Sequence, residues 1–523
     1  MWLKGAILAA MTFFSGPALA QVARTDSGLV QGVASGGITI FKGVPFAAPP
    51  TGELRWRPPQ PAVAWRGVRK ADAFAPACMQ TGVSMPGEAP PTISEDCLYL
   101  NIWKPADTKG KNLAVLVKIY GGGFSSGSAA MPLYWGDKIA ARGVIVVTFG
   151  YRLGPFGFLA HPELTAESPN HSSGNYGLLD QVAALEWIKR NIGAFGGDAE
   201  RVTIMGQSAG GNAVSILMAS PLAKGLFQRA IAQSGGLFEP IKLAPHYLLA
   251  NAEKQGVAYA GSVGAQSIAG LRALAADALL RGRAGTVAHA VIEPYLLPRM
   301  PYDVFAAGAQ NDVPLLLGSN ANEAGAMIPG LDSVTASTFE ADIEKQIGRL
   351  PPQLLAAYPH ADDKQAREAR LGFERDLRFG WDMWAWARLA AIKGRSNVYY
   401  YHFTKAPPFP AGSIYQDWGA SHFAELWYMF DRLHQENWDW TAADRTLVDT
   451  MSGYWVNFAK DGDPNGRGLP PWPAFKGTDG NVQYLGDPVS TGGVANLPPL
   501  ETFDKVYSGL RGAPFGTPSS AGP

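Results

Sequence analysis

Short runs of apolar residues recur along the chain, and longer segments with helical spacing separate them. The runs are rich in Val and Ile and are largely apolar instead of alternating regularly with polar positions. Such runs are typical of strands in a sheet that helices cover on both faces. The runs that we interpret as strands are residues 113–120, 144–150, 202–205, 230–233, 313–317 and 398–403. The pattern predicts an α/β fold with a mostly parallel central sheet flanked by helices.

Nothing in the sequence divides the chain into several domains. Internal repeats and low-complexity tracts are absent. The proline- and glycine-rich segments at residues 44–61 and 462–473 are short and contain aromatic residues, so we interpret them as packed surface loops and not as linkers. We therefore expect one large domain over residues 21–523.

The first twenty residues differ in pattern from the rest of the chain. Lys4 gives a basic start, residues 5–14 form a short apolar run, and residues 18–20 (ALA) match a small-residue cleavage site. The alternative is a membrane anchor, but this run is too short to cross about 30 Å of hydrocarbon. We interpret residues 1–20 as a signal peptide that is removed, and we expect an exported protein, either periplasmic or secreted.

Charge and composition exclude several classes of partner. The 523 residues include 44 basic and 44 acidic side chains, which leaves no electrostatic footprint for nucleic acid or anionic lipid. Apolar residues make up 47% and charged residues 17%, a balance that supports a large buried core. After the signal peptide, no stretch is long and apolar enough for stable membrane insertion.

The eight histidines lack metal-ligand spacing, so we expect neither a metal nor a cofactor.

The chain contains two cysteines, Cys78 and Cys97. In an oxidising compartment a pair at this separation favours a disulfide, and two free buried thiols are the alternative. In the chain-entropy model, closing a loop of this size stabilises a fold by about 3 kcal/mol. We predict a structural disulfide.

Candidate chemistry begins with a GxSxG pattern at residues 206–210 (GQSAG). A second match at residues 123–127 (GFSSG) shows that the pattern alone is weak, so its context must decide. A nucleophile elbow needs a strand, a sharp turn and a helix whose N-terminus faces the developing oxyanion. Ser208 follows a β-branched run and precedes residues with helical spacing, whereas Ser125 precedes a small, polar segment. We predict Ser208 as the nucleophile.

Three glycines, residues 121–123, directly follow the first apolar run. A flexible turn is one interpretation of them. The other is that backbone N–H groups turn inward toward a substrate oxygen, which glycine permits without a steric penalty. Glycines at a strand end, upstream of an elbow, form the layout of an oxyanion hole. We predict its donors at Gly122, Gly123 and Ala209, where they would stabilise the tetrahedral intermediate of acyl transfer.

A serine nucleophile needs a histidine base, and the base needs a carboxylate. His422 lies in a glycine-bearing loop that turns into a helix, whereas His402 lies within an apolar run and is interpreted as a core residue. Glu323 follows the run at 313–317, which places it at the carboxyl edge of the predicted sheet, where ligand sites of open α/β sheets gather. Acidic residues on surface loops are common, so spacing alone leaves these two assignments open.

Further motifs occur in order along the chain and together resemble one family. They are residues 41–47 (FKGVPFA), 95–101 (EDCLYLN), 121–124 (GGGF), 175–177 (NYG), 195–198 (FGGD) and 206–210 (GQSAG). Over nearly all of its mature length the chain resembles the type-B carboxylesterases, a cholinesterase-like family of the α/β-hydrolase superfamily. The resemblance implies an α/β-hydrolase fold and hydrolysis of carboxylic esters. The chain order Ser, acid, His agrees with it.

The resemblance also implies a role for individual residues. It assigns Ser208, Glu323 and His422 to a catalytic triad, Gly122, Gly123 and Ala209 to the oxyanion hole, Ser234 to support of the acid, Cys78 and Cys97 to the family's first disulfide loop, and Arg55 and Glu95 to a structural ion pair.

Three features depart from the family pattern. Tyr120 stands before the glycines where many relatives have His, and Gln207 precedes the nucleophile where cholinesterases have a glutamate. The segment between Cys78 and Cys97 contains no tryptophan, so the aromatic face that would bind a quaternary ammonium is missing. We therefore do not expect choline esters as substrates.

The predicted reaction is the hydrolysis of a small-molecule ester through an acyl-enzyme intermediate. For the substrate pocket we predict Phe124, which adjoins the oxyanion glycines, together with Gln207, Trp381 and Trp427. An amidase or peptidase with the same triad is an alternative, and so is a binding protein of this family that has lost catalysis. The sequence leaves the natural ester and the oligomeric state open.

Overall fold

The computed structural model describes residues 21–83, 85, 88–107, 112–328, 330–477 and 480–520, so the predicted signal peptide lies outside the described residues. Within them, one eleven-stranded sheet forms the centre of the molecule, in the order β16-β15-β14-β13-β12-β11-β9-β10-β8-β4-β3. From β10 to β15 in this order the neighbours pair in parallel, whereas the strands beyond them at both edges pair antiparallel. The prediction of a mostly parallel sheet is confirmed.

The strands of this sheet are β3 (Val33–Ser35), β4 (Ile38–Pro45), β8 (Tyr99–Pro105), β9 (Leu113–Ile119), β10 (Ile145–Phe149), β11 (Gly197–Gln207), β12 (Arg229–Gln233), β13 (Leu315–Asn320), β14 (Val398–Phe403), β15 (Val482–Leu485) and β16 (Ser490–Gly492). Two small sheets lie outside it. They are formed by β1 (Val22–Arg24), β2 (Leu29–Gln31) and β5 (Val68–Lys70), and by β6 (Ala77–Cys78) and β7 (Ile93–Ser94).

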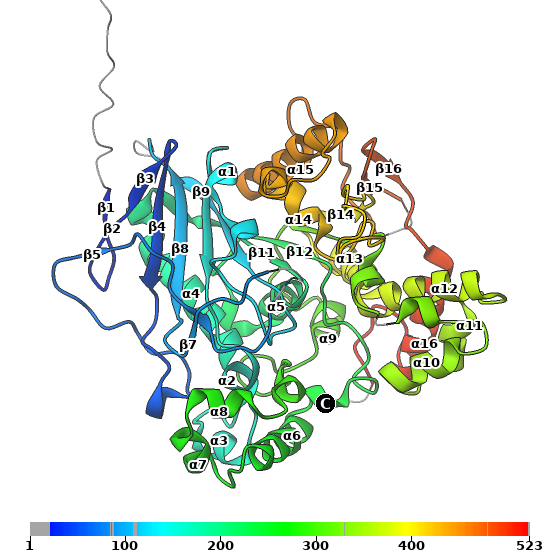
Figure 1. Ribbon diagram of the computed structural model, residues 1–523, viewed down its shortest axis with the longest axis horizontal. Coiled ribbons are helices and arrows are strands. Elements are labelled where there is room, and N and C mark those ends of the chain that lie inside the picture. The colour runs from blue at the N-terminus through cyan, green and yellow to red at the C-terminus, as the bar shows by residue number, and fades with distance from the viewer. Residues whose placement is uncertain are drawn as a thin grey trace, which may run out of the picture.

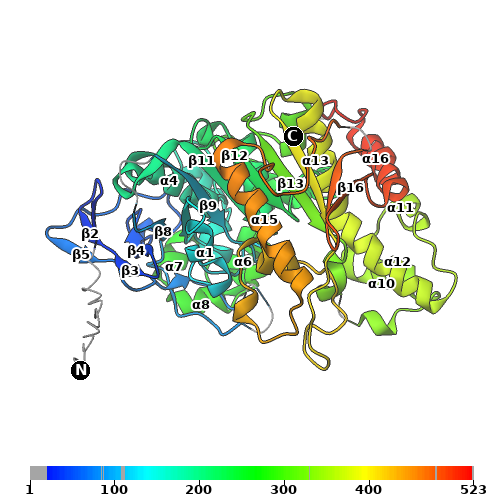
Figure 2. The ribbon, with the colours of Figure 1, turned by 90° about the horizontal axis from the view of Figure 1, so that it is seen from above.

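Helices flank the sheet. They are α1 (Asp137–Ala140), α2 (Gly154–Phe158), α3 (Pro162–Glu167), α4 (Tyr176–Asn191), α5 (Ala209–Ala219), α6 (Leu249–Ser262), α7 (Ile268–Ala273), α8 (Ala276–Leu280), α9 (Pro301–Ala306), α10 (Phe339–Ile347), α11 (Pro352–Ala356), α12 (Asp363–Arg375), α13 (Trp381–Lys393), α14 (Ala424–Met429), α15 (Ala442–Asp461) and α16 (Leu497–Arg511). The N-terminal strands lie at one end of the molecule, and α12 and α16 lie at the other (Figures 1 and 2).

The core explains why the apolar runs became central strands. Every residue of β10 is buried, and so are the residues of β9 after its first position. Because successive side chains of a strand point to opposite faces, burial of all of them requires cover on both faces. On β9 and β11 this cover comes from α5 and α15, which both pack against these strands.

β13 departs from its predicted bounds. The sequence places this strand at residues 313–317, but it begins at Leu315 and ends at Asn320. Its last residues, Gly318 to Asn320, continue to pair with Tyr401 to Phe403 of β14. Their small and polar side chains hide the strand end in the sequence.

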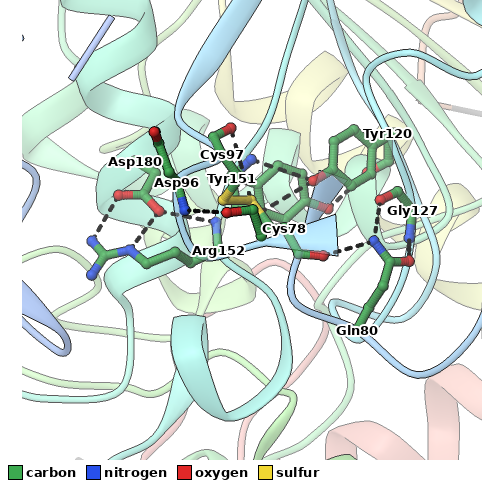
Figure 3. The surroundings of a disulfide bond; sticks show 10 residues. Cys78, Gln80, Asp96, Cys97, Tyr120, Gly127, Tyr151, Arg152 and Asp180 are labelled. Carbon is green, nitrogen blue, oxygen red and sulfur yellow. Dashed lines mark hydrogen bonds and ion pairs between the residues drawn. A yellow bond between two sulfur atoms is a disulfide. The ribbon is translucent and has the colours of Figure 1, made fainter. Parts of the chain in front are cut away.

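Covalent and ionic links fix the N-terminal part of the chain. Cys78 and Cys97 form the predicted disulfide (Figure 3). Arg55 pairs with Glu95 at 2.5 Å, which confirms the ion pair that the family resemblance implies. Among the helices of the described residues, none is long and apolar enough to cross a membrane.

Candidate active site

Ser208 lies at the sharp turn between β11 and α5. Its backbone has φ 59° and ψ −128°, a conformation that a residue with a side chain rarely adopts. The flanking glycines are needed, because a Cβ at Gly206 would collide with the carbonyl of Gly210 and one at Gly210 would collide with the carbonyl of Ile119. This is the strand, turn and helix arrangement of a nucleophile elbow, and α5 begins at Ala209, directly after the serine.

The second GxSxG match has a different environment. Ser125 is exposed, and its hydroxyl donates to the carbonyl of Gly122 within a turn. The residues after Ser125 form no helix before a single 3-10 turn, Pro132–Tyr134. The elbow context that the sequence predicts is therefore found at Ser208.

Glu323 and His422 lie side by side although 99 positions separate them. Glu323 opens a 3-10 turn after β13, and His422 lies in the loop before α14; both side chains are buried. The imidazole Nδ1 lies 2.6 Å from Oε2 of the carboxylate, whose Oε1 accepts the backbone N–H of Asn320 at 2.6 Å. With its Nδ1–H donated to the carboxylate, the imidazole keeps Nε2 as a proton acceptor.

Hydrogen bonds hold the histidine loop against the acidic turn. The backbone N–H of Asn322 donates to the carbonyl of Ala420 at 3.0 Å, and the side chain of Asn320 donates to the carbonyl of Ser421 at 2.7 Å. These contacts join the residues just before Glu323 to the two residues before His422, so they fix the two side chains relative to each other.

Phe379 supports the imidazole of His422 by ring stacking, a contact that the sequence pattern does not predict. Its ring stacks on His422 with centroids 4.6 Å apart and an angle of 18° between the planes. Phe379 lies in a π-helical turn, Asp376–Gly380, between α12 and α13. A phenylalanine in a helical stretch carries no signal of such a contact, whereas π-helical turns are frequent at functional sites.

Gln207, the residue before Ser208, contacts His422 directly. Its side-chain nitrogen lies 3.1 Å from Nε2 of His422, so the amide donates to the nitrogen that a serine proton would reach. Ser208 Oγ makes no hydrogen bond with any residue that the structure describes. Hydrogen bonds of catalytic groups are often loose without substrate and tighten when substrate binds.

The glycine loop after β9 presents free backbone donors. Gly122 and Gly123 have φ values of 109° and 60°, and a Cβ at Gly122 would collide with the carbonyl of Ser126. Their N–H groups donate to no residue in the described part of the chain. Ala209 is the first residue of α5, where backbone N–H groups have no partner within the helix. The three predicted oxyanion donors are therefore available.

Contacts on both sides hold this loop in place (Figure 3). Before the glycines, the Tyr120 and Tyr151 rings stack at 4.4 Å, and the Tyr151 hydroxyl donates to the Tyr120 carbonyl at 2.9 Å. After them, the side-chain amide of Gln80 exchanges two hydrogen bonds of 2.8 Å with the backbone of Gly127. Gln80 follows Cys78 closely, so the disulfide loop helps to position the predicted oxyanion donors. Tyr120, the departure from His, serves as one of these anchors.

The predicted pocket and support residues lie in different places. Phe124 is buried beside the glycine loop and packs on Phe158 at 4.8 Å. Trp427 is buried in α14, where it packs on Trp438 at 5.0 Å. Trp381 packs against α16, because its indole donates to Asp504 at 2.8 Å.

Ser234, which the resemblance assigns to support of the acid, follows β12 with φ 47° and is fully buried. Its hydroxyl has no hydrogen-bond partner among the described residues, and Glu323 receives its second hydrogen bond from the backbone of Asn320 instead.

The described residues contain no group of three or more side chains that could hold a metal ion.

Comparison with known proteins agrees with this geometry. A family model described as "Carboxylesterase family" matches residues 20–494. The chain belongs to the carboxylesterase family. The resemblance and the α/β-hydrolase fold are thereby confirmed, and the protein is a carboxylic ester hydrolase.

Curated relatives of this carboxylesterase cover nearly its whole length. A fumonisin B1 esterase of Sphingopyxis macrogoltabida is 38% identical over 515 residues, covering 94% of this chain and 92% of that protein. A para-nitrobenzyl esterase of Bacillus subtilis is 35% identical over 513 residues, covering 93% and 98%. Among solved structures, a PNB esterase superposes with a TM-score of 0.79 at 32% identity and covers 92% of this chain and 100% of its own.

Proposed function

We propose that this carboxylesterase cleaves esters through an acyl-enzyme on Ser208, with His422 as the base and Glu323 as the acid of a catalytic triad. The observation that carries the proposal is the 2.6 Å contact between Glu323 and His422, two residues brought together at the edge of the sheet where the elbow presents Ser208. No other histidine in the described residues contacts a carboxylate that follows a central strand in this way.

In acylation, Nε2 of His422 takes the Ser208 proton as Oγ attacks the ester carbonyl, and then returns the proton to the departing alcohol. The N–H groups of Gly122, Gly123 and Ala209 stabilise the oxyanion that forms. In deacylation, His422 activates water against the acyl-enzyme and Ser208 is regenerated. Glu323 remains ionised throughout and stabilises the imidazolium.

The substrate class is a carboxylic ester without a quaternary ammonium group. The relatives are named for fumonisin B1, para-nitrobenzyl esters and, in a human protein 34% identical over 479 residues, cocaine. These names share ester hydrolysis but no common acid or alcohol. We take fumonisin B1 as the first natural substrate to test, because the relative named for it is 38% identical over 94% of this chain.

We also propose that the protein works outside the cytoplasm. The formed disulfide between Cys78 and Cys97 supports this, since such bonds persist in oxidising compartments. The mass of the protein recovered from periplasm and medium tests the proposal, because removal of the signal peptide leaves Gln21 as the first residue. Recovery of the protein from the cytoplasm alone, with an intact N-terminus, would contradict it.

Steady-state kinetics test the proposed triad. We expect wild type to hydrolyse p-nitrophenyl esters, and Ser208→Ala and His422→Ala to lower kcat by about 10⁴-fold or more with the fold intact. Ser125→Ala is the matched control for the second GxSxG match; it removes a hydrogen bond to the Gly122 carbonyl and should lower kcat far less than Ser208→Ala does. A matched p-nitroanilide distinguishes the alternatives: faster amide than ester hydrolysis would identify an amidase, and a folded but inactive wild type would identify a binding member of the family.

A further inference from the structure

A second buried acid, Glu425, lies directly behind the proposed triad. It is 0% exposed at the start of α14. Its Oε1 accepts the side-chain amide of Gln233 at 3.2 Å, and its Oε2 accepts that of Asn320 at 2.5 Å. The backbone N–H of the same Asn320 donates to Glu323 at 2.6 Å. Asn320 therefore joins the two carboxylates.

The face of the sheet that holds Glu425 also carries a buried lysine, Lys118 on β9. In the register of the sheet, Lys118 lies opposite Met205 of β11, which lies opposite Ile231 of β12. Gln233 follows Ile231 by two residues, and side chains two apart on a strand share a face. Lys118 thus lies on the face from which Gln233 reaches Glu425.

Lys118 has no hydrogen-bond acceptor in the described part of the chain, although its side chain is only 1% exposed. Its Nζ lies over the rings of Tyr134 and Phe430, 5.1 and 5.9 Å from their centroids. Burying an ammonium is costly unless an opposite charge is near. Burial lowers the pKa of Lys118 to about 7, and the negative charge of Glu425 acts against this shift.

Several titratable groups surround Glu425. Glu323 and His422 approach it from the triad, Tyr401 from β14 and Tyr134 from the segment after the oxyanion loop. Burial first, and then Glu323, raise the pKa of Glu425 to about 7, while Asn320 and His422 lower it. Opposite charges buried near each other favour each other's charged forms, so a charged Lys118 would favour an ionised Glu425.

We propose that Lys118 is a positioning residue for catalysis: as a buried counter-ion it keeps Glu425 ionised, and Glu425 acts through Asn320 to hold Glu323 against His422. An ionised carboxylate accepts from both Gln233 and Asn320, whereas a protonated one gives up part of its acceptor capacity. The hydrogen bond that holds the Asn320 side chain would then weaken, and with it the turn in which the Asn320 backbone N–H donates to Glu323. This inference rests on the proposed function of the triad.

A double-mutant cycle tests the proposal on the full-length protein. Lys118→Met keeps the shape of the side chain and removes the charge, and Glu425→Gln removes the carboxylate. We expect each change to lower kcat for a p-nitrophenyl ester by about tenfold, the equivalent of one pKa unit, with KM unchanged. Because both act on the same carboxylate, the double variant should be no slower than Glu425→Gln.

Lys104→Met is the matched control. Lys104 on β8 is also a buried lysine, but its Nζ donates to Gln21 at 2.8 Å, away from the triad. We expect it to keep wild-type kcat. Lys118→Arg and Lys118→Gln then separate charge from packing: Arg should retain more kcat than Gln at equal thermal stability.

Losses that multiply in the double variant, wild-type kcat in a folded Lys118→Met, or equal loss in the Arg and Gln variants would each overturn the proposal. These results remain distinct from a failure of the triad assignment. That assignment fails if Ser208→Ala stays active or folded wild type is inactive, whereas the Lys118 proposal fails while wild type is active and Ser208→Ala is not.

Discussion

At the scale of single residues, Gln207 shapes the environment of His422, the proposed base. Its amide donates to Nε2 of His422 at 3.1 Å, so it competes with Ser208 for the lone pair of that nitrogen. An amide is neutral, and the imidazolium formed during each step receives no charge stabilisation from this side. A carboxylate at the same position would provide that stabilisation.

We predict that Gln207→Glu moves the acid limb of the kcat/KM profile to higher pH by about one unit, because a negative charge favours the protonated imidazole. The profile for a neutral p-nitrophenyl ester from pH 4 to 9 measures the shift. Gln207→Met, which is uncharged and similar in length, removes only the amide donor and should move the limb less than Gln207→Glu. A shift toward lower pH in the Glu variant would contradict the described contact.

At the scale of elements, the glycine loop after β9 carries two of the predicted oxyanion donors. It can present Gly122 and Gly123 to a substrate because the Tyr120–Tyr151 stack holds one end and the Gln80–Gly127 bonds hold the other. Three elements far apart in sequence thus fix two backbone donors. A change that moves the loop should impair stabilisation of the oxyanion without impairing the fold.

Gly122→Ala makes this prediction testable. Its Cβ would collide with the carbonyl of Ser126, so we expect the loop to shift and kcat to fall by about 100-fold, the cost of losing one oxyanion donor. Gly36→Ala serves as the control, because Gly36 also has a positive φ, of 55°, but has no atom within 4 Å of the added Cβ. Unchanged kcat in a folded Gly122→Ala variant would argue against the oxyanion assignment.

At the scale of the whole molecule, the sequence predicts the architecture well because strands that are buried on both faces consist of continuous apolar runs. It also predicts the carboxyl-edge position of Glu323, since strand order and strand ends suffice for that. The supporting contacts of Phe379, Asn320 and Glu425 depend on how distant elements approach each other, which spacing does not encode. Lys118 is hidden for the same reason, because it interrupts a run otherwise read as apolar strand.

Tryptophan content does not show where in the fold each tryptophan lies. Trp381 and Trp427 both follow from composition as pocket candidates, yet one indole donates to Asp504 of α16 and the other packs on Trp438. Helical periodicity shows which side of a helix is apolar, but it does not show whether that side meets the core or a substrate.

His402, which the sequence analysis interprets as a core residue, is half-buried on β14 and gives a prediction for the stability of the whole molecule. Burial, and then the positive charge of Arg375, lower the pKa of His402 from 6.5 to about 4. Between these values the unfolded chain binds a proton that the folded chain does not, so this stability is complete above pH 6.5 and is lost as the pH falls toward 4. We expect Tm to decrease over this range, and less steeply in His402→Phe, as measured by circular dichroism. An equal slope in both proteins would contradict the assignment.

A pre-steady-state burst tests most directly whether Ser208 forms an acyl-enzyme. Mature wild type is mixed with excess p-nitrophenyl ester. Where deacylation is the slower step, we expect a rapid release of about one p-nitrophenol per enzyme before steady turnover. Mass spectrometry of the quenched protein should then find the acyl group on Ser208, and Ser208→Ala should show neither burst nor adduct. An acyl group on another residue, or a burst that persists in Ser208→Ala, would contradict the assignment of Ser208 as the nucleophile.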